Sequence, residues 1–172
     1  MTVSPVRLNH AVLFVADLNR AEHFYTAVFG FEVAAREAQA NAVFLRSPRS
    51  GNHHDLGLFD VGSDAAPRVP RGLGLYHLAW QIDPIDELAL AKVALVGADA
   101  FTGESSHGAT KSVYGVDPDG NEFEVMWMLP RDEWGDFENA APVEPLDLDL
   151  EVSRWSGTPT AGRIESSLEA HS

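Results

Sequence analysis

The hydrophobic residues of this chain form short runs that appear in the same order in each half of the sequence. In the first half, the apolar run 8–15 predicts a strand, and Asp17 after it is a residue type that often caps a helix N-terminus. Apolar residues then recur at helical spacing as far as Gly30, where a left-handed C-cap is expected. Three more strands are predicted after this helix, over 31–38, 41–47 and 55–61.

The second half repeats this order after a Gly- and Pro-rich stretch, 62–72, which predicts a linker. A strand is predicted over 74–82 and a helix over 85–96, ended by Gly97. Further strands are predicted over 98–105, 110–117 and 121–127. The last two flank the sequence DPDG, which favours a tight turn because Pro presets its backbone angle and Gly permits a positive one. The repeated order predicts an α+β fold built from two βαβββ modules.

Length and composition limit the class of protein. The chain has 172 residues, of which 45% are hydrophobic, so a sizeable core is expected. It contains no long apolar run and no cysteine, which argues against a membrane span, disulfides, thiolate metal sites and cysteine nucleophiles. The N-terminal sequence MTVSPVRLNH lacks the features of a secretory signal. We therefore expect a cytoplasmic protein that does not associate with membranes.

The charge is strongly negative, at −14 for the whole chain. Such a chain is expected not to bind nucleic acid, because affinity for phosphate backbones comes largely from cationic groups. Residues 130–172 carry ten acidic residues and three arginines, which is half of the excess charge. The predicted organisation is a catalytic domain over 1–129, with modules at 6–66 and 73–129, followed by this acidic extension, which is expected to be solvated and partly disordered.

Three polar residues lie inside otherwise apolar strands and are candidate metal ligands. His10 and His77 are predicted near the middle of the first strand of each module, and Glu124 lies in the last strand. Two imidazoles and a carboxylate on one face of a sheet form the facial triad that suits non-haem iron(II). Each residue also has a structural interpretation, because a strand histidine is often a core or surface residue and Glu124 could face solvent.

Three further residues lie at strand ends or in the last hairpin. His54 opens the fourth predicted strand and His107 precedes the seventh, while Tyr114 is expected opposite Glu124 across the DPDG turn. A histidine beside a metal can take and return a proton near neutral pH. Taken singly, the histidines could be loop or turn residues and the tyrosine a packing residue, but together they favour a reactive site.

At these residues the sequence resembles the vicinal oxygen chelate superfamily, and within it the type I extradiol catechol dioxygenases. The most specific match is H-G-x-T-x-x-x-Y-x-x-D-P-x-G-N-x-x-E, which runs here from His107 to Glu124. Two shorter matches are His54-Asp55 before a strand and His77-Leu78-Ala79. The resemblance covers roughly residues 6–130, although many members of this family are about twice as long. It implies paired βαβββ modules that form a partly closed mixed sheet around a metal.

The resemblance also implies a role for each candidate residue. His10, His77 and Glu124 would hold iron(II), with manganese(II) as the alternative metal. His54 would act as base and then as acid toward a catechol-like substrate, while His107 and Tyr114 would hydrogen-bond its oxygens. Ring opening with O2 beside the diol would give a hydroxymuconic semialdehyde-type product. The expected partners are thus a small catechol-like molecule and O2, and the expected assembly is a homo-oligomer, a dimer or larger.

Other functions on the same fold are open at this point. A glyoxalase-like isomerase, an epimerase or a fosfomycin-resistance-type transferase would share the fold and part of the metal site, because fold does not fix function. Glyoxalase-type sites usually need a fourth ligand near the end of the first module, where this chain offers Asp55 and Asp60. A metal-free binding protein of the bleomycin-resistance type would have no need for the three candidate ligands.

Overall fold

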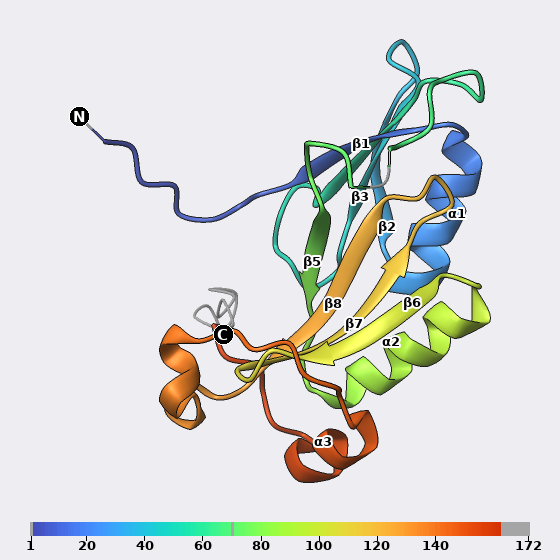
Figure 1. Ribbon diagram of the computed structural model, residues 1–172. Coiled ribbons are helices and arrows are strands. Elements are labelled where there is room, and N and C mark those ends of the chain that lie inside the picture. Colours follow the sequence, from blue (N-terminus) through green and yellow to red (C-terminus); the bar gives the residue numbers. More distant parts are fainter. Residues whose placement is uncertain (1, 70, 163–172) are drawn as a thin grey trace, which may run out of the picture. The chain divides into compact units, whose positions relative to one another are not determined.

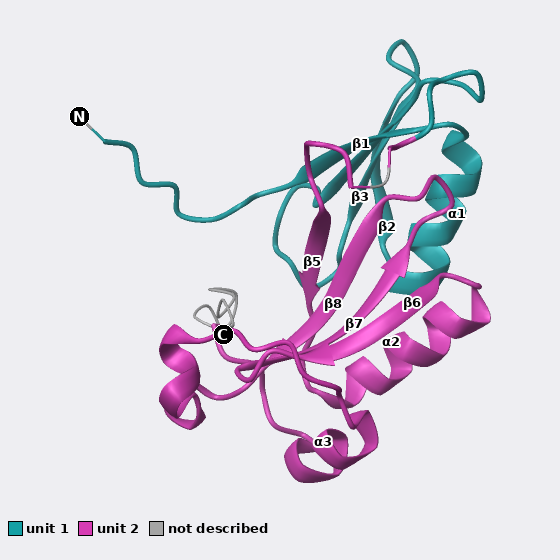
Figure 2. Cartoon of the chain, viewed as in Figure 1, with its two compact units in different colours: residues 1–67 teal, residues 68–172 magenta. Residues whose placement is uncertain are grey.

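The computed structural model describes residues 2–69 and 71–162. The chain divides into two compact units, residues 1–67 and 68–172, coloured separately in Figure 2. The division falls within the stretch 62–72 that the sequence predicts as a linker. Each unit contains one four-stranded sheet and follows the order βαβββ (Figure 1). The predicted α+β fold of two repeated modules is therefore confirmed.

The first unit is one mixed sheet with one helix. Its elements are β1 (Ala11–Val15), α1 (Leu18–Phe29), β2 (Glu32–Glu37), β3 (Ala42–Arg46) and β4 (Leu56–Asp60). The strand order is β1-β4-β3-β2, with β1 parallel to β4 and the other pairs antiparallel. Helix α1 returns the chain to the sheet so that β2 runs in the same direction as β1. The two antiparallel pairings that follow then give β4 this direction as well, so it pairs with β1 in parallel.

Helix α1 begins and ends where the sequence predicts. The Asp17 carboxylate accepts a hydrogen bond from the Arg20 amide at 3.0 Å, and Gly30 ends the helix with φ of 65°. This value lies in the left-handed region that favours glycine. The buried residues of the helix, Ala21, Phe24 and Tyr25, pack toward β3 and β4. The helix therefore covers one face of the first sheet.

The second unit repeats the arrangement and adds three short elements. The repeated elements are β5 (His77–Gln81), α2 (Asp86–Gly97), β6 (Phe101–Ser106), β7 (Thr110–Val116) and β8 (Glu122–Met128). The added ones are the 3-10 helices Arg131–Glu133 and Gly135–Asn139, and α3 (Leu148–Trp155). The strand order β5-β8-β7-β6 matches that of the first unit, and β5 is parallel to β8. In the structure described, no helix has both the length and the apolarity needed to cross a membrane.

Strand β8 alternates between a buried and a partly exposed face. Phe123, Val125 and Trp127 are almost completely buried, and α2 packs against β6, β7 and β8. Because successive side chains on a strand point to opposite faces, Glu122 and Glu124 lie on the side away from the buried residues. The hydrophobic core thus leaves the other face of the second sheet for polar side chains.

The first strand of each unit begins later than the sequence predicts. His10 immediately precedes β1, and His77 is the first residue of β5, so the prediction that both lie near mid-strand is wrong. The preceding apolar residues Leu8 and Leu75 are 80% and 60% exposed, respectively. Apolar sequence therefore continues beyond the hydrogen-bonded ladder in both modules. Both histidines lie at strand starts, where the backbone has fewer constraints.

Residues 130–162 belong to the second unit and are mostly exposed, as expected of a solvated extension, but they form short helices that a few buried residues attach to the rest of the unit. Leu148 at the start of α3 is buried, and α3 packs on α2. The Trp127 indole N–H donates to the Thr158 carbonyl at 3.2 Å, and Glu144 pairs with Ser106 in a backbone bridge. A few apolar anchors and backbone hydrogen bonds therefore outweigh the acidic composition. Residues 163–172 of the predicted extension lie outside the described residues.

The Asp86 carboxylate binds the end of the segment 130–162 through hydrogen bonds, and we expect its contribution to the stability of the fold to depend on pH. Asp86 accepts hydrogen bonds from the Gly157 amide at 2.7 Å and the Ser156 hydroxyl at 2.6 Å. These bonds lower its pKa below the ordinary 3.8. A lowered folded-state pKa gives stability that is present above the ordinary value and is lost as pH falls through the folded value. The melting temperature of Asp86→Asn should therefore lie below that of wild type at pH 7, and the difference should shrink below pH 3.8.

The matched control for this prediction is Asp64→Asn, which removes the charge of an exposed aspartate in the first unit. Thermal unfolding followed by circular dichroism between pH 2 and pH 7 would measure both variants. An Asp86→Asn difference that does not change with pH would show that the charge of this carboxylate does not stabilise the attachment.

Candidate functional site

Four of the predicted site residues lie close together in the second unit. Tyr114 and Glu124 are paired directly across the β7–β8 hairpin, as the DPDG turn predicts. His77 opens β5 beside β8, and His107 lies in the turn between β6 and β7. We call the face of this sheet that carries His77, Tyr114 and Glu124 the polar face.

His77 and Glu124 form a pair of potential metal ligands. The His77 Nε2 atom lies 3.1 Å from Glu124 Oε2, and the two side chains are 28% and 12% exposed. Two donors that bind the same divalent ion, each about 2 Å from it, have a separation of this order. His77 Nδ1 is buried without a hydrogen-bond partner among the described residues. An imidazole nitrogen and a carboxylate oxygen therefore face one point, which fits a divalent cation.

The third predicted ligand, His10, belongs to the first unit. Within residues 2–69 and 71–162, no three histidine, cysteine or acidic side chains are grouped closely enough to hold a metal ion. The Nδ1 atom of His10 lies 2.9 Å from the amide oxygen of Asn9. Because this oxygen accepts, Nδ1 carries the proton and Nε2 keeps the lone pair that a metal needs.

The C-terminal segment determines the tautomer of His107. Its Nδ1 donates to the Pro142 carbonyl at 2.8 Å, so in the neutral ring Nε2 is the acceptor. Nε2 lies 2.7 Å from the Tyr114 hydroxyl and 2.9 Å from Ser105 Oγ. The two hydroxyl groups are themselves 3.0 Å apart. His107 Nε2 is thus oriented to accept a hydrogen bond from Tyr114 or Ser105.

Tyr114 is held in its protonated form. Burial raises the pKa of its hydroxyl above the ordinary 10.0, and the Glu124 charge acts in the same direction, while the Ser105 hydrogen bond opposes both. Its hydroxyl lies 2.7 Å from His107 Nε2 and 3.4 Å from Glu124 Oε1, so its one proton can be donated to either acceptor but not to both at once. Tyr114 therefore links the histidine to the carboxylate and has a proton to donate.

The turn that carries His107 is shaped by a glycine and an aromatic ring. Gly108 has φ of 75°, in the left-handed region, and a Cβ at this position would overlap the ring of Phe137. The His107 amide donates to the Thr110 carbonyl at 2.9 Å, which closes the turn. Phe137, like Pro142, lies beyond β8. The C-terminal segment therefore contacts both the backbone and the ring of this histidine turn.

A small pocket lies beside these residues. Its volume is about 190 Å³, below the roughly 300–1,000 Å³ of sites for drug-sized ligands. The lining residues are Tyr76, His77, Thr102, Gly103, Tyr114, Gly115, Glu122 and Phe123. This described lining contains no lysine or arginine. The size and polarity of the pocket suit a small molecule without a large negative charge.

His54 is placed beside His10 in the first unit. The centroids of the two rings are 4.4 Å apart, and the edge of the Phe44 ring packs against His54. Burial lowers the pKa of His54 below the ordinary 6.5, and the charges of His10 and His53 add to this effect. Its Nδ1 lies 3.0 Å from Nδ1 of His53. The imidazole is therefore neutral at pH 7, as a general base requires.

Two residues that contact the predicted site were not expected from the sequence. Ser105 could have been found, because β6 register pairs it with Ser112, two residues from Tyr114 on the same face. Pro142 could not, since it acts through a backbone carbonyl in the acidic extension. The residues that complete the environment of His107 thus come from an adjacent strand and from a distant segment.

Comparison with known proteins finds relatives among dioxygenases. The chain is 27% identical over 128 residues to the catechol-2,3-dioxygenase of Bacillus subtilis (strain 168), covering 74% of this chain and 43% of the relative. It is 31% identical over 129 residues to biphenyl-2,3-diol 1,2-dioxygenase 3 of Rhodococcus globerulus, covering 73% of this chain and 65% of the relative. The chain thus spans less than two thirds of the length of either relative.

Solved structures with other functions share the fold. A glyoxylase/bleomycin resistance protein/dioxygenase domain from Frankia sp. EAN1pec superposes with a TM-score of 0.61 and 22% identity, covering 73% of this chain and all of that one. A mutant of the fosfomycin resistance protein FosX from Listeria monocytogenes, complexed with Mn(II) and 1S,2S-dihydroxypropylphosphonic acid, gives a TM-score of 0.59 and 18% identity. It covers 78% of this chain and 99% of that one. At these identities the likeness concerns the fold.

The family itself follows from the sequence match over both units. Residues 7–125 match the family model for the Glyoxalase/Bleomycin resistance protein/Dioxygenase superfamily. The match covers β1 through most of β8, and therefore both βαβββ modules and every predicted site residue. The chain belongs to the Glyoxalase/Bleomycin resistance protein/Dioxygenase superfamily.

Proposed function

We propose that this protein is an extradiol dioxygenase that opens the ring of a small catechol-like substrate with O2 at an iron(II) site. The observation that carries the proposal is the continuous set of contacts from His107 through Tyr114 to Glu124 and His77, beside a small pocket. Two similar proteins named as catechol or diol dioxygenases support it.

The proposed metal ligands are His77 and Glu124 with His10 as the third. His77 and Glu124 already place a nitrogen and an oxygen 3.1 Å apart. His10 precedes β1 by one residue, close to the place that His77 has in the second module, and its Nε2 is free of the Asn9 hydrogen bond. Two histidines and one carboxylate leave coordination positions open, which suits non-haem iron. Iron(II), when bound there, supplies the redox chemistry that lets O2 react with the ring.

Tyr114 and His107 are proposed to orient the substrate oxygens. The raised pKa of Tyr114 keeps its hydroxyl protonated, so this hydroxyl can donate a hydrogen bond to a catechol oxygen in the adjacent pocket. His107 Nε2 can then accept a hydrogen bond from Ser105 or from a substrate hydroxyl, because Nδ1 is committed to the Pro142 carbonyl. Positioned hydrogen-bond donors stabilise negative charge as it develops on the substrate.

His54 is proposed as the acid–base residue. Its lowered pKa keeps the ring neutral at pH 7, and Nδ1 faces His53, which leaves Nε2 to take a proton from a substrate hydroxyl. The same nitrogen can return this proton when the O–O bond breaks. Both oxygen atoms of O2 enter the product and no external reductant is needed.

The pocket favours a neutral diol. Its described lining has no cationic side chain, and the nearby Arg68 is engaged by Glu122 and by backbone carbonyls. A phosphonate or a carboxylated ring would enter without a cationic partner, at the cost of desolvating its charge. This argues against a fosfomycin-type substrate, although the fold is shared.

The test is oxygen uptake by protein reconstituted anaerobically with iron(II), measured over a panel of neutral and carboxylated catechols. We expect one O2 consumed per catechol, with a yellow ring-fission product, and neutral rings preferred. Protein loaded with manganese(II) would show whether that metal substitutes. A loaded iron site without O2 uptake for any diol would contradict the proposal and favour an isomerase or transferase.

A further inference from the structure

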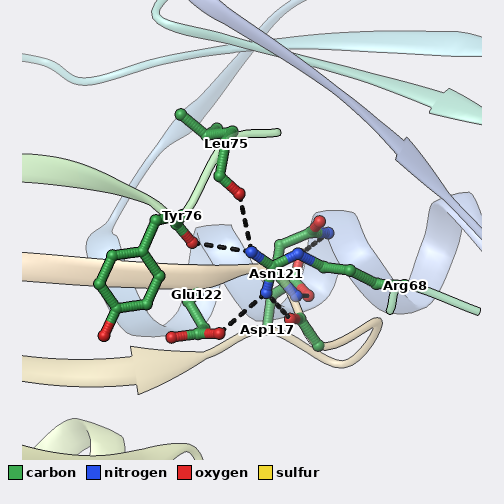
Figure 3. Close-up of polar contacts among 7 residues, drawn as sticks. Arg68, Leu75, Tyr76, Asp117, Asn121 and Glu122 are labelled. Atoms are coloured by element: carbon green, nitrogen blue, oxygen red, sulfur yellow. Dashed lines mark hydrogen bonds and ion pairs between the residues drawn. The ribbon is translucent and has the colours of Figure 1, made fainter. Parts of the chain in front are cut away.

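The guanidinium group of Arg68 links the start of β5 to the start of β8 through hydrogen bonds. Arg68 Nη2 donates to the carbonyls of Leu75 and Tyr76, each at 2.8 Å. Its Nη1 donates to the Gly120 carbonyl at 3.1 Å and to Glu122 Oε1 at 3.0 Å. Figure 3 shows the group between these acceptors. We call this set of four hydrogen bonds the Arg68 clamp.

The residues that the Arg68 clamp contacts on each strand lie within two positions of a proposed metal ligand. Tyr76 precedes His77, and Glu122 lies two residues before Glu124 and pairs in register with His77. The clamp therefore fixes the backbone at the point where the two ligand-bearing strands begin to run side by side.

The turn before β8, which carries the Gly120 carbonyl, is held in place by its own hydrogen bonds. Asp117 accepts hydrogen bonds from the amides of Asp119 and Asn121 at 2.9 and 2.8 Å, and from the Asn121 side chain at 2.9 Å. Arg68 contacts this turn through the Gly120 carbonyl. Arg68 thus holds the start of β5 against a preorganised turn.

The β5 side has little else to hold it. Strand β5 is at the edge of its sheet and pairs with β8 in the strand order. Leu75 and Tyr76 are 60% and 68% exposed, so burial does little to fix the residues before His77. The first residue of an edge strand is where fraying is expected, because its backbone groups have few partners.

We propose that Arg68 is a positioning residue that sets His77 at its distance from Glu124. This inference rests on the proposed iron site. Arginine suits the role because its two terminal nitrogens present four N–H groups in a fixed plane, one for each acceptor. Lysine has one nitrogen and cannot serve two separate strands in the same way. Glu122 supplies charge, but three of the four acceptors are backbone carbonyls.

The test compares Arg68→Ala and Arg68→Lys in the full chain. Anaerobic iron(II) titration should show affinity roughly 10–100-fold weaker for Arg68→Ala, the range typical of lost outer-shell support. Arg68→Lys should lie close to Arg68→Ala. Arg36→Ala, which removes the ion pair between Arg36 on β2 and Glu22 on α1, is the matched control and should bind iron as wild type does.

Amide hydrogen exchange of metal-free protein tests the clamp independently of iron. Faster exchange over 77–81 in Arg68→Ala, with β7 unchanged, is expected. Unchanged exchange there, or wild-type iron affinity in Arg68→Ala, would overturn the proposal. If wild-type protein binds no iron, the proposed function fails and exchange alone decides whether the clamp orders β5. If Arg68→Ala does not fold, Arg68→Lys takes its place in both measurements.

Discussion

Replacement of Glu124 by alanine is expected to remove most of the bound iron(II). The carboxylate is the charged member of the proposed ligand set, and its Oε2 atom lies 3.1 Å from His77 Nε2. Without it, two neutral imidazoles would hold a divalent cation with no charge compensation. We expect iron affinity to fall by more than about 100-fold, beyond the usual cost of losing an outer-shell partner. Metal content after anaerobic loading and desalting measures the loss.

The control for this variant is Glu104→Ala. Glu104 is also a strand glutamate of the second unit and pairs with Lys92 at 2.7 Å, so its removal costs a similar ion pair away from the proposed ligands. Its iron content should equal that of wild type. Full iron occupancy in Glu124→Ala would show that this carboxylate is not a ligand and that the proposed set is wrong.

Replacement of His54 by alanine is expected to lower the turnover number by about 10²–10⁴-fold, the usual contribution of a general acid–base residue. Iron and catechol binding should be retained, because His54 is not among the proposed ligands. The neutral imidazole at pH 7 follows from its lowered pKa. Single-turnover measurements with saturating O2 would separate the loss in chemistry from any loss in binding.

An exposed histidine of the same unit provides a matched control. His23 lies on α1 away from His54, so His23→Ala removes an imidazole and leaves the proposed base and its neighbours in place. Its turnover should stay close to that of wild type. If His54→Ala turns over at the wild-type rate, the acid–base role belongs to another residue.

The repeated fold was predictable because its signals are local. Asp17 and Gly30 mark the ends of α1 by their own hydrogen bond and backbone angle. The DPDG sequence forms its turn from its own side chains, so the pairing of Tyr114 with Glu124 follows from counting residues outward. Features that depend on one or two turns of chain can be inferred without tertiary contacts.

The environment of the site was less predictable because it depends on distant segments. The Pro142 carbonyl reaches His107 across 35 positions of sequence, and a backbone group has no residue-type signature. Arg68 acts on β5 from a stretch that composition identifies only as a linker. The strand starts at His10 and His77 were misplaced because apolar sequence does not show where backbone pairing begins.

The β7–β8 hairpin implies an order of assembly. Tyr114 and Glu124 are separated by ten positions, so closing the loop between them costs little chain entropy. His77 reaches Glu124 only when β5 joins β8 in parallel, after the chain has passed through α2, β6 and β7. Contacts between residues near in sequence tend to form faster than long-range pairings. The tyrosine and the carboxylate should thus meet early in folding, and uptake of iron(II) should report the late docking of β5.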